Sequence, residues 1–344
     1  MREYVRVLKP GPLSTVQDTG RFGAMAWGVP HSGAADAVSM RIANLLVGND
    51  QGAAVLETTM GGVELEFLQS AVFAVMGAPG AVMLDGAQIG PGLPIQARPG
   101  SLLKLGGLEK GARQYIAFRG GLDVPIVLGS RSTYLKGALG GLDGRALKKD
   151  DILGILPDGA SKETAELVEG FANPSLERDN EGRCLLRVTR GTMDPRFPEG
   201  EIDRMLASDY VVSPESDRMG IRLKGYGVKH SSGADILSGG IEPGAVQVPG
   251  SGEPIILTAD RQTTGGYTKA FSVISADRPK LGQLRPSDRV KFSMVAIDDA
   301  YEAFIALERL ISSCTKPSSG KKGIMALKLR VDGRVYDVEV EEIS

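Results

Sequence analysis

The chain divides its apolar residues into short runs that end at glycine, and this pattern limits it to a fold of short strands. The clearest run covers residues 71–76 and is closed by Gly77. We expect further strands over residues 82–84, 102–105 and 114–118, with a turn between them at Asp85-Gly86. Glycine accounts for 46 of the 344 residues, about twice the usual ~7% share. Short strands joined by tight glycine turns are typical of a mainly β protein built as a barrel or a sandwich.

A few short helices are predicted beside the strands. Residues 38–46 carry apolar side chains at helical spacing, and Gly48 provides a stop. Towards the C-terminus, Asp299 and Glu302 have the spacing of a capping box at the start of an amphipathic helix. A shorter helix is expected within residues 161–169. The fold class predicted is therefore α+β, with strands in the majority.

The polar stretch between residues 157 and 182 predicts a boundary between two β-rich halves. We expect residues 1–160 to form the N-terminal half and residues 183–313 the C-terminal half. Residues 314–344 then read as a flexible linker followed by a β-hairpin, in which apolar residues alternate on both sides of a turn at Asp332-Gly333.

Composition argues against several classes of partner and site. The net charge of −2 gives no electrostatic reason to expect nucleic acid or a membrane as partner. Cys184 and Cys314 are far apart in the sequence, which predicts a reducing compartment and, with no signal peptide, a cytoplasmic location. His31 and His230 show no metal-binding spacing, so no metal site is expected. No P-loop or dinucleotide motif is present, so no nucleotide is expected on this chain.

A first candidate site lies in the N-terminal loops. Gln17, Asp18, Arg21, Ser32 and Asp36 bring a carboxamide, carboxylates, a guanidinium and a hydroxyl together within twenty residues. Such groups orient a planar polar ligand through paired hydrogen bonds. The alternative is loop architecture, with Asp18 pairing Arg21 and Asp36 near a helix start.

A second candidate site lies in the stretch from residue 244 to residue 267. Gln247, Gln262 and Tyr267 supply neutral donors and acceptors suited to an amide or ureido group. The adjacent Gly265-Gly266 allows the backbone to approach a ligand or another loop closely. The alternative is a set of turn side chains whose hydrogen bonds are satisfied within the protein.

Two cations complete the candidates. Lys269 follows Tyr267 by two residues and is a possible base or charge stabiliser. Arg218, in the run Ser216-Asp217-Arg218-Met219-Gly220, could present its guanidinium to a carboxylate, although a surface salt bridge is the commoner outcome.

These motifs resemble a known family. The segments that carry the resemblance are Thr15-Val16-Gln17-Asp18-Thr19-Gly20-Arg21, Gly129-Ser130-Arg131-Ser132-Thr133, Ser216-Asp217-Arg218-Met219-Gly220 and Gln262-Thr263-Thr264-Gly265-Gly266-Tyr267. They are similar to segments of the KipA, or allophanate hydrolase subunit 2, family, and the similarity spans roughly residues 5–297. The family includes carboxyltransferase-like proteins such as the C subunit of 5-oxoprolinase.

The resemblance implies two cyclophilin-like β-barrel halves that work beside a smaller homologous subunit of the KipI, or allophanate hydrolase subunit 1, type. It also implies biotin, brought by a separate biotin carboxyl carrier that a biotin carboxylase loads. On that basis we expect carboxyl transfer to an amide- or urea-like acceptor. The residues that would bind and polarise the ureido group are Gln247, Gln262 and Tyr267. Asp36 or Lys269 would act as the base. Arg21 or Arg218 would hold a carboxylate.

Two other functions follow from the same resemblance. One is ATP-dependent cleavage of 5-oxoproline to glutamate, with the ATP site on another subunit. The other is non-enzymatic regulation of a kinase inhibitor. In addition, residues 327–340 look like the opening strands of a biotin carboxyl carrier domain, but no biotin-accepting Ala-Met-Lys-Met follows them. This hairpin is either a carrier remnant or incidental.

Overall fold

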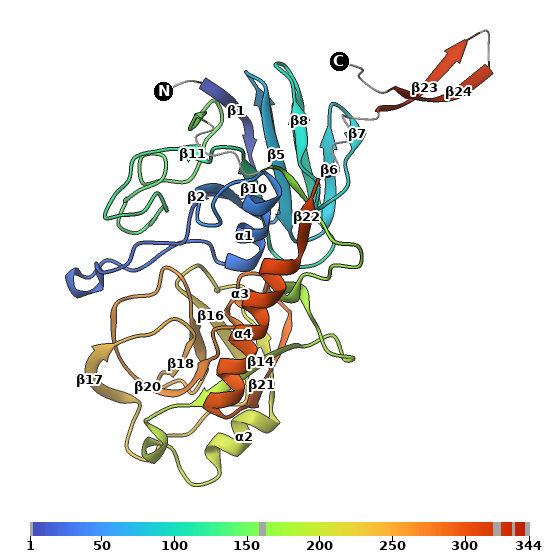
Figure 1. The fold of residues 1–344 in the computed structure, drawn as a ribbon. Helices are drawn as coiled ribbons and strands as arrows, with labels where there is room; N and C mark the ends of the chain where they lie inside the picture. Colours follow the sequence, from blue (N-terminus) through green and yellow to red (C-terminus); the bar gives the residue numbers. More distant parts are fainter. Residues whose placement is uncertain (1–2, 158–162, 319–324, 332–333, 341–344) are drawn as a thin grey trace.

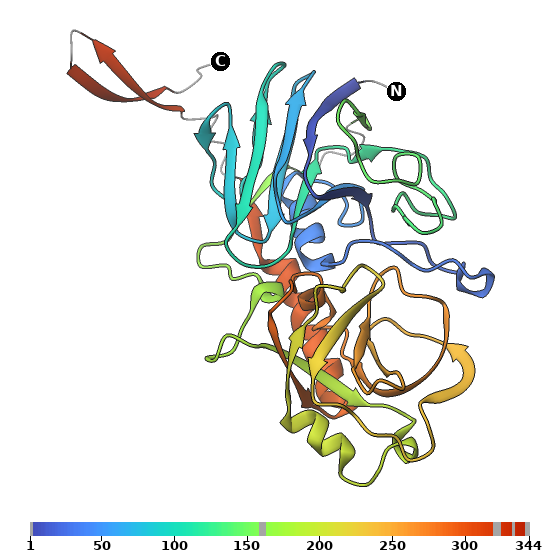
Figure 2. The same ribbon diagram turned by 180° about the vertical axis from the view of Figure 1, so that it is seen from behind.

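A computed structural model describes residues 3–157, 163–318, 325–331 and 334–340. Two β-rich halves are stacked on each other, with the N-terminal half at the top of Figure 1 and the C-terminal half below it. Figure 2 shows the same arrangement from behind. The prediction of a mainly β fold with short helices is confirmed.

The strands of the N-terminal half form two sheets. One has the order β11 (Leu122–Asp123), β12 (Ile152–Ile155), β1 (Glu3–Pro10), β4 (Val63–Phe67), β9 (Leu102–Leu108), β6 (Gly80–Leu84) and β7 (Ala87–Gln88). The other has the order β2 (Leu13–Gln17), β3 (Val55–Thr59), β10 (Arg113–Phe118), β5 (Ala71–Gly77) and β8 (Ile95–Ala97). Side chains from both sheets, including Leu65 and Phe118, share one buried core. In β4 every second side chain enters this core, as expected for a strand with one buried face.

Turn chemistry fixes the pairing of β6 with β7. Leu84 is opposite Ala87, so Asp85 and Gly86 form a two-residue hairpin loop. Their φ angles are 52° and 83°, in the left-handed region that such a turn requires. The turn predicted at Asp85-Gly86 is therefore confirmed.

The C-terminal half is a closed barrel. Its strands follow the order β14 (Cys184–Arg190), β21 (Arg289–Met294), β15 (Asp209–Val212), β16 (Gly220–Gly225), β19 (Ile255–Leu257), β18 (Ala245–Val248) and β20 (Thr264–Val273). The barrel closes because β20 also pairs with β14, while β17 (Asp235–Gly240) pairs with β20 outside the ring. Phe271 and Phe292 lie in its core with ring centroids 5.6 Å apart.

The helices are short and lie outside the strands. They are α1 (Ala37–Leu46), α2 (Glu201–Ala207), α3 (Arg278–Leu281) and α4 (Ile297–Ser313), with 3-10 turns η1 (Met25–Trp27), η2 (Pro174–Leu176) and η3 (Asp194–Arg196). The predicted helix over residues 38–46 is confirmed as α1, which ends at Leu46 and is followed by Gly48 at φ 76°. It packs on β5 and β10, opposite the sandwich core.

Helix α4 joins the two halves. It contacts β14 of the barrel and α1 of the N-terminal half. Glu308 accepts two hydrogen bonds from the Arg41 guanidinium, at 2.6 and 2.7 Å. The helix is where the sequence predicted it, but its N-cap is Ala296 without a side-chain cap, so the capping box of Asp299 and Glu302 is wrong.

Two predictions about the connecting segments are corrected. Residues 165–167 form strand β13 (Ala165–Leu167), whereas a helix was expected; residues 161 and 162 lie outside the described part of the chain. This strand pairs with β22 (Thr315–Pro317), so the start of the supposed linker is also ordered. The two three-residue segments stabilise each other by a long-range ladder, which local periodicity cannot reveal.

The predicted C-terminal hairpin is present. β23 (Met325–Val331) pairs antiparallel with β24 (Arg334–Val340), with Val331 opposite Arg334. The turn residues 332 and 333 lie outside the described residues. Both views show the hairpin standing apart from the two stacked halves.

Candidate functional site

A pocket of about 460 Å³ opens on the barrel, and we call it the barrel pocket. Its lining includes Gln247 from β18, Tyr267 from β20 and Gln262 from the loop between β19 and β20. Strand β16 adds Arg222 and Lys224. The structure thus brings together the three neutral polar side chains that the sequence singled out in this region.

The floor of the barrel pocket holds an unsatisfied donor. Gln247 is 2% exposed, and its Nε2 has no hydrogen-bond partner. A side-chain carbon at Gly265 would lie 2.7 Å from this Nε2 and 2.4 Å from Ile241 Cδ1. Glycine at position 265 therefore leaves the space that the Gln247 carboxamide occupies. A buried donor without a partner is costly, and a ligand carbonyl oxygen would satisfy it.

The rim of the barrel pocket is polar and accessible. Tyr267 is 41% exposed and Gln262 is also exposed. Lys224 donates to Glu253 at 2.8 Å. Lys136 is the lining residue that comes from the N-terminal half. The pocket therefore offers the buried carboxamide of Gln247 in its interior and both neutral and charged groups at its rim.

Lys269 does not line the barrel pocket. Its Nζ donates to the Gly240 carbonyl at 3.1 Å and lies 3.7 Å from a Glu242 carboxylate oxygen. Gly266 is beside Ser238, whose Oγ would be 3.3 Å from an added side-chain carbon. Both residues support the strand pairing around the pocket.

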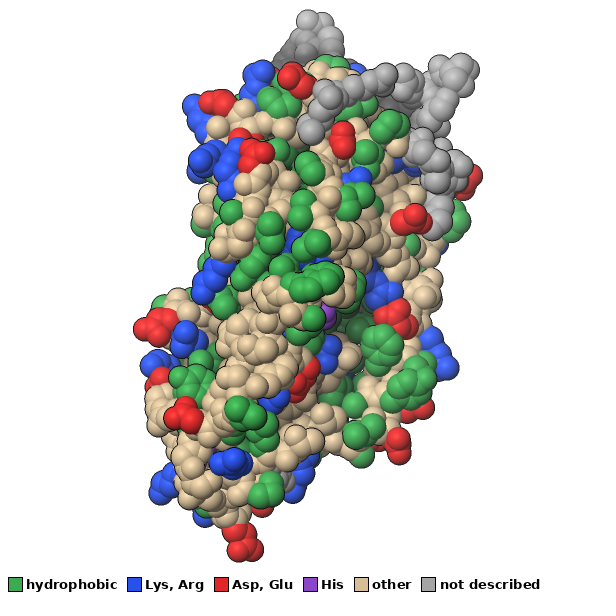
Figure 3. Space-filling view, turned by 90° about the vertical axis from the view of Figure 1, so that its left-hand side faces the viewer, with side chains coloured by type: hydrophobic (Ala, Val, Ile, Leu, Met, Phe, Trp, Pro, Cys, Tyr) green, Lys and Arg blue, Asp and Glu red, His purple; other side chains and the backbone are tan. Residues whose placement is uncertain are grey.

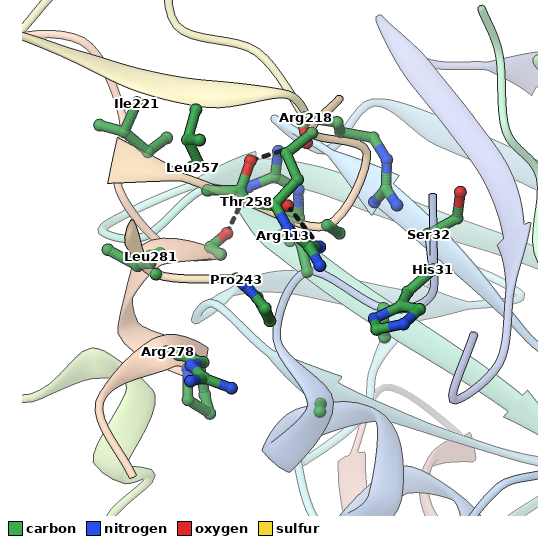
Figure 4. A pocket seen from close by; sticks show the side chains of 18 of the residues that line it. His31, Ser32, Arg113, Arg218, Ile221, Pro243, Leu257, Thr258, Arg278 and Leu281 are labelled. Carbon is green, nitrogen blue, oxygen red and sulfur yellow. Dashed lines mark hydrogen bonds between the residues drawn. The ribbon is translucent and has the colours of Figure 1, made fainter. Parts of the chain in front are cut away.

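A second cavity, of about 280 Å³, lies between the two halves, and we call it the inter-half cavity. The N-terminal half contributes His31 and Ser32, and the C-terminal half contributes Arg261, Arg278 and Thr258. Figure 4 shows Arg278 on one side of this cavity and His31 with Ser32 on the opposite side. On the face seen in Figure 3, hydrophobic and basic side chains gather where the two halves meet.

Most of the N-terminal candidates serve the loops instead of a cavity. Asp18 accepts hydrogen bonds from Ser130 Oγ and the Arg131 N–H, both at 2.6 Å, and from Ser132 Oγ. Gln17 donates to Thr133 O at 3.2 Å. These contacts tie strand β2 to the 130–133 loop. The Gly-Ser-Arg-Ser-Thr motif thus has a structural explanation.

Arg21 and Ser32, like Gln17 at its Oε1, have buried polar atoms without a hydrogen-bond partner. Arg21 is completely buried and donates to Ser132 O, but its Nε and one terminal nitrogen have no partner. Burial lowers its pKa, although Asp18 and Asp260 oppose this change. Ser32 has φ 55° and an unpartnered Oγ. Ser32 lines the inter-half cavity, whereas Arg21 lines neither cavity.

Asp36 is the N-cap of α1 and is completely buried. Its carboxylate accepts hydrogen bonds from Ser39 N, Ser39 Oγ, Ser175 Oγ and Gln283 Nε2. Burial raises its pKa, and these donors act in the opposite direction. It lines neither cavity, so the structure places this candidate base in a capping role.

Arg218 does hold carboxylates, but they belong to the protein. Its guanidinium donates to Asp260 at 2.9 and 3.1 Å, to Glu57 of the N-terminal half, and to the Gly33 carbonyl at 2.6 Å. Burial works against the charge of Arg218, yet Asp260 and Glu57 raise its pKa above the usual range. The group joins the two halves at the wall of the inter-half cavity.

Several residues of the interface between the halves were missed by sequence reasoning. Gln283 accepts from the N–H groups of Ala112 and Arg113, at 3.0 and 3.1 Å, and Arg113 also lies 3.4 Å from Glu57. No local spacing relates these positions, because they lie up to 171 residues apart in the chain. The two candidate groups do not meet in one cavity: the barrel pocket and the inter-half cavity are distinct, and they share Asp217 and Leu257 in their linings.

Comparison with known proteins assigns the family. Residues 27–294 match the family described as carboxyltransferase domain, subdomain A and B. The chain belongs to this carboxyltransferase domain family. The relationship predicted from the sequence motifs is thereby confirmed.

Relatives of this carboxyltransferase domain protein fall into two groups. The C subunit of 5-oxoprolinase from Escherichia coli (strain K12) is 38% identical over 299 residues, which cover 87% of this chain and 94% of that protein. The Haemophilus influenzae C subunit of 5-oxoprolinase is 34% identical, over 86% of this chain and 93% of that protein. Urea amidolyase of Saccharomyces cerevisiae is 33% identical over 92% of this chain, which spans 18% of that much longer protein. The relatives are thus subunits or regions of enzymes.

Solved structures agree with the second group. The urea carboxylase of Kluyveromyces lactis superimposes with a TM-score of 0.82 at 31% identity, over 98% of this chain and 31% of that chain. The urea amidolyase of K. lactis gives a TM-score of 0.81 at 32% identity, over 90% of this chain and 20% of that chain. The carboxyltransferase domain therefore occurs within larger chains whose other parts this chain does not cover.

Two further features of the described residues bear on the site. They contain no group of three or more His, Cys, Asp or Glu side chains arranged to hold a metal ion. None of the helices described is both long and apolar enough to cross a membrane.

Proposed function

We propose that this chain is a subunit of a biotin-dependent carboxyltransferase that acts on an amide- or urea-like substrate, and that it is active in a complex. The observation that carries the proposal is the unpartnered Gln247 Nε2 in a pocket that Gln262 and Tyr267 also line. The similarity to K. lactis urea carboxylase supports it, because the superposition extends over 98% of this chain.

The residues of the barrel pocket fit a ureido ring. Gln247 supplies a buried N–H donor for a carbonyl oxygen, and Gly265 keeps that donor in place by having no side chain. Biotin would supply a carboxyl group carried on its ureido ring. Fixed N–H and O–H donors stabilise negative charge that develops on such an oxygen, and in a buried pocket they do so without reorganisation.

The chain's own residues would divide the work. Gln247 and Gln262 would bind and orient the planar groups, and the Tyr267 hydroxyl, at the exposed rim, would exchange a proton with the acceptor nitrogen. Lys269 would hold β17 and β20 together through Gly240 and Glu242. The proposed complex also contains a biotin carboxylase, a biotin carboxyl carrier and a smaller homologous subunit.

A second candidate function is that of the C subunit of 5-oxoprolinase, with ATP handled by another subunit. The specific observation in its favour is that the match covers 94% of the E. coli protein at 38% identity. The barrel pocket suits this substrate as well, because 5-oxoproline contains a cyclic amide whose carbonyl accepts the same hydrogen bonds.

The test is recovery of the complex through this chain, followed by turnover assays with ATP, bicarbonate and each of urea, related amides and 5-oxoproline. Avidin separates the two candidates, because it blocks a biotin carrier and leaves a biotin-free hydrolase active. Avidin-sensitive carboxylation supports the proposal. Avidin-insensitive cleavage of 5-oxoproline overturns it in favour of the second candidate.

Variants then locate the site. Gln262→Ala and Tyr267→Phe are expected to lower kcat/KM of the recovered complex by about 10²-fold or more, as for lost transition-state donors. Tyr301→Phe is the matched control, since Tyr301 is 63% exposed on α4 and lines neither cavity. Wild-type turnover in both site variants would show that the site lies elsewhere.

A further inference from the structure

We infer that the inter-half cavity binds a small organic carboxylate, held by Arg261 and Arg278 and by the Ser32 hydroxyl. This site is separate from the barrel pocket, and the inference does not rest on the proposed carboxyl transfer. Four observations carry it: unpaired cations, an unsatisfied hydroxyl, the electrostatics of the cavity and its apolar walls.

The two guanidiniums lack carboxylate partners. Arg261 is 1% exposed and donates to neutral groups, Ile241 O at 3.1 Å and Thr258 O at 3.4 Å. Arg278 donates to Val273 O at 3.4 Å. Within the described part of the chain, neither has an acidic oxygen at ion-pair distance. Arg218, in the wall of the same cavity, is by contrast fully paired with Asp260 and Glu57.

The electrostatics of the cavity favour an anion. Burial and the nearby Arg278 lower the pKa of Arg261 to about 10, and Glu242 offsets this only in part. Burial and the charge of Arg261 also lower the pKa of His31. Glu242 already lies 3.7 Å from Lys269. A buried charge without a partner is unfavourable, so an anion in this cavity would offset much of that cost.

The opposite wall supplies a neutral donor. Ser32 is 6% exposed, lines the cavity and has an Oγ without a hydrogen-bond partner. Its φ of 55° is unusual for a residue with a side chain, and its N–H is fixed by Ala259 O at 3.1 Å across the interface. A constrained backbone that leaves a buried hydroxyl unsatisfied is typical of a binding site.

The shape and lining of the cavity select the class of anion. Phe22, Pro243, Leu257 and Leu281 provide apolar walls around about 280 Å³. A guanidinium forms two parallel hydrogen bonds with a carboxylate, and the apolar walls suit a body of a few carbon atoms. An inorganic anion would leave these walls without contacts.

Butyrate and its neutral isostere butyramide are the probes for calorimetric titration and thermal unfolding of the full chain, at an ionic strength fixed with sodium chloride. We expect butyrate to bind and to raise the Tm, while butyramide does neither. Arg278→Gln should weaken butyrate binding at least tenfold. Lys224→Gln, in the barrel pocket, is the matched control and should leave butyrate binding unchanged.

Arg261→Met is a control for misfolding. It replaces an unpaired buried cation by an apolar side chain, so the Tm without ligand should stay the same or rise. The rise in Tm caused by butyrate should be abolished. Equal binding of butyramide, or unchanged butyrate binding in both arginine variants, would overturn the site. Inorganic phosphate that binds as tightly as butyrate would overturn the carboxylate assignment. All of these measurements lack biotin and partners, so their failure is distinguishable from failure of the transfer proposal.

Discussion

The Gln247 side chain from β18 lies against Gly265 of β20, and a side-chain carbon on the glycine would lie 2.7 Å from the glutamine Nε2. The two residues therefore depend on each other: the missing side chain at one position is the room for the carboxamide at the other. This contact explains why a glycine stands in a strand, where it normally weakens the structure.

Replacing Gly265 by alanine should displace the Gln247 carboxamide and lower kcat/KM of the assembled complex by about 10²-fold, since small misplacements at a site have effects of that size. Gly266→Ala is the matched control, because its added carbon meets Ser238 Oγ at 3.3 Å and nothing closer. Steady-state kinetics of both variants check this. Equal activities would show that Gln247 does not contact the substrate.

Arg218→Met should destabilise the protein by about 3–5 kcal/mol, because it leaves the buried carboxylates of Glu57 and Asp260 without their partner. Urea unfolding measured by circular dichroism tests this. Arg222→Met, which changes an exposed arginine four positions further along the chain, should change stability by less than about 0.5 kcal/mol. If both variants unfold alike, the buried group is not what holds the halves together.

The Glu57 carboxylate should make stability fall in acid. Burial opposes its ionised form, but Arg218 and Arg113 outweigh burial and hold its pKa below the usual range. The pKa of a glutamate in the unfolded chain is about 4.3. Because the pKa of Glu57 is lower than this in the folded protein, its carboxylate stabilises the folded state above about pH 4.3, and this stabilisation is lost as the pH falls further. Unfolding free energies between pH 7 and pH 3 should fall more steeply for the wild type than for Glu57→Gln. Parallel curves would contradict this assignment.

Asp36→Ala should lower the free energy of unfolding by at least about 1–2 kcal/mol, the effect of a lost helix cap. The kcat of the folded enzyme should be largely retained. The reason is that the hydrogen-bond partners of this carboxylate are donors that fix α1, η2 and Gln283. Calorimetric unfolding and kcat per folded molecule separate the two effects. A loss of kcat at unchanged stability would instead restore Asp36 as the catalytic base.

Truncation after Ser318 should leave the unfolding free energy of the two halves nearly unchanged, because β22 and its pairing with β13 are retained. The hairpin of β23 and β24 pairs with itself. If it is a carrier-derived element, its removal should change the KM for the biotin carrier and leave that for the small substrate unchanged. Identical kinetics for both chains would mark the hairpin as incidental to the transfer.

The sequence by itself determined the elements whose signals are local. The run over residues 71–76 closed by Gly77, the helix of residues 38–46 and the Asp85-Gly86 turn were all predictable, since period and glycine placement act over a few residues. Motifs distributed along the chain also identified the family. Local signals failed at β13, where three residues are a strand because a distant segment pairs with them.

Tertiary structure decided which polar residues line a cavity. Gln17 and Asp18 were predicted as site residues, yet both hydrogen-bond to the 130–133 loop, more than a hundred positions away in the chain. Arg261 and Arg278 acquire their significance only because the packing of the two halves buries the first and partly buries the second without a carboxylate partner. Sequence spacing shows which groups are near each other along the chain. The energetic cost of a charge depends on its burial and on whether it has a partner, and both are set by contacts that only the folded chain creates.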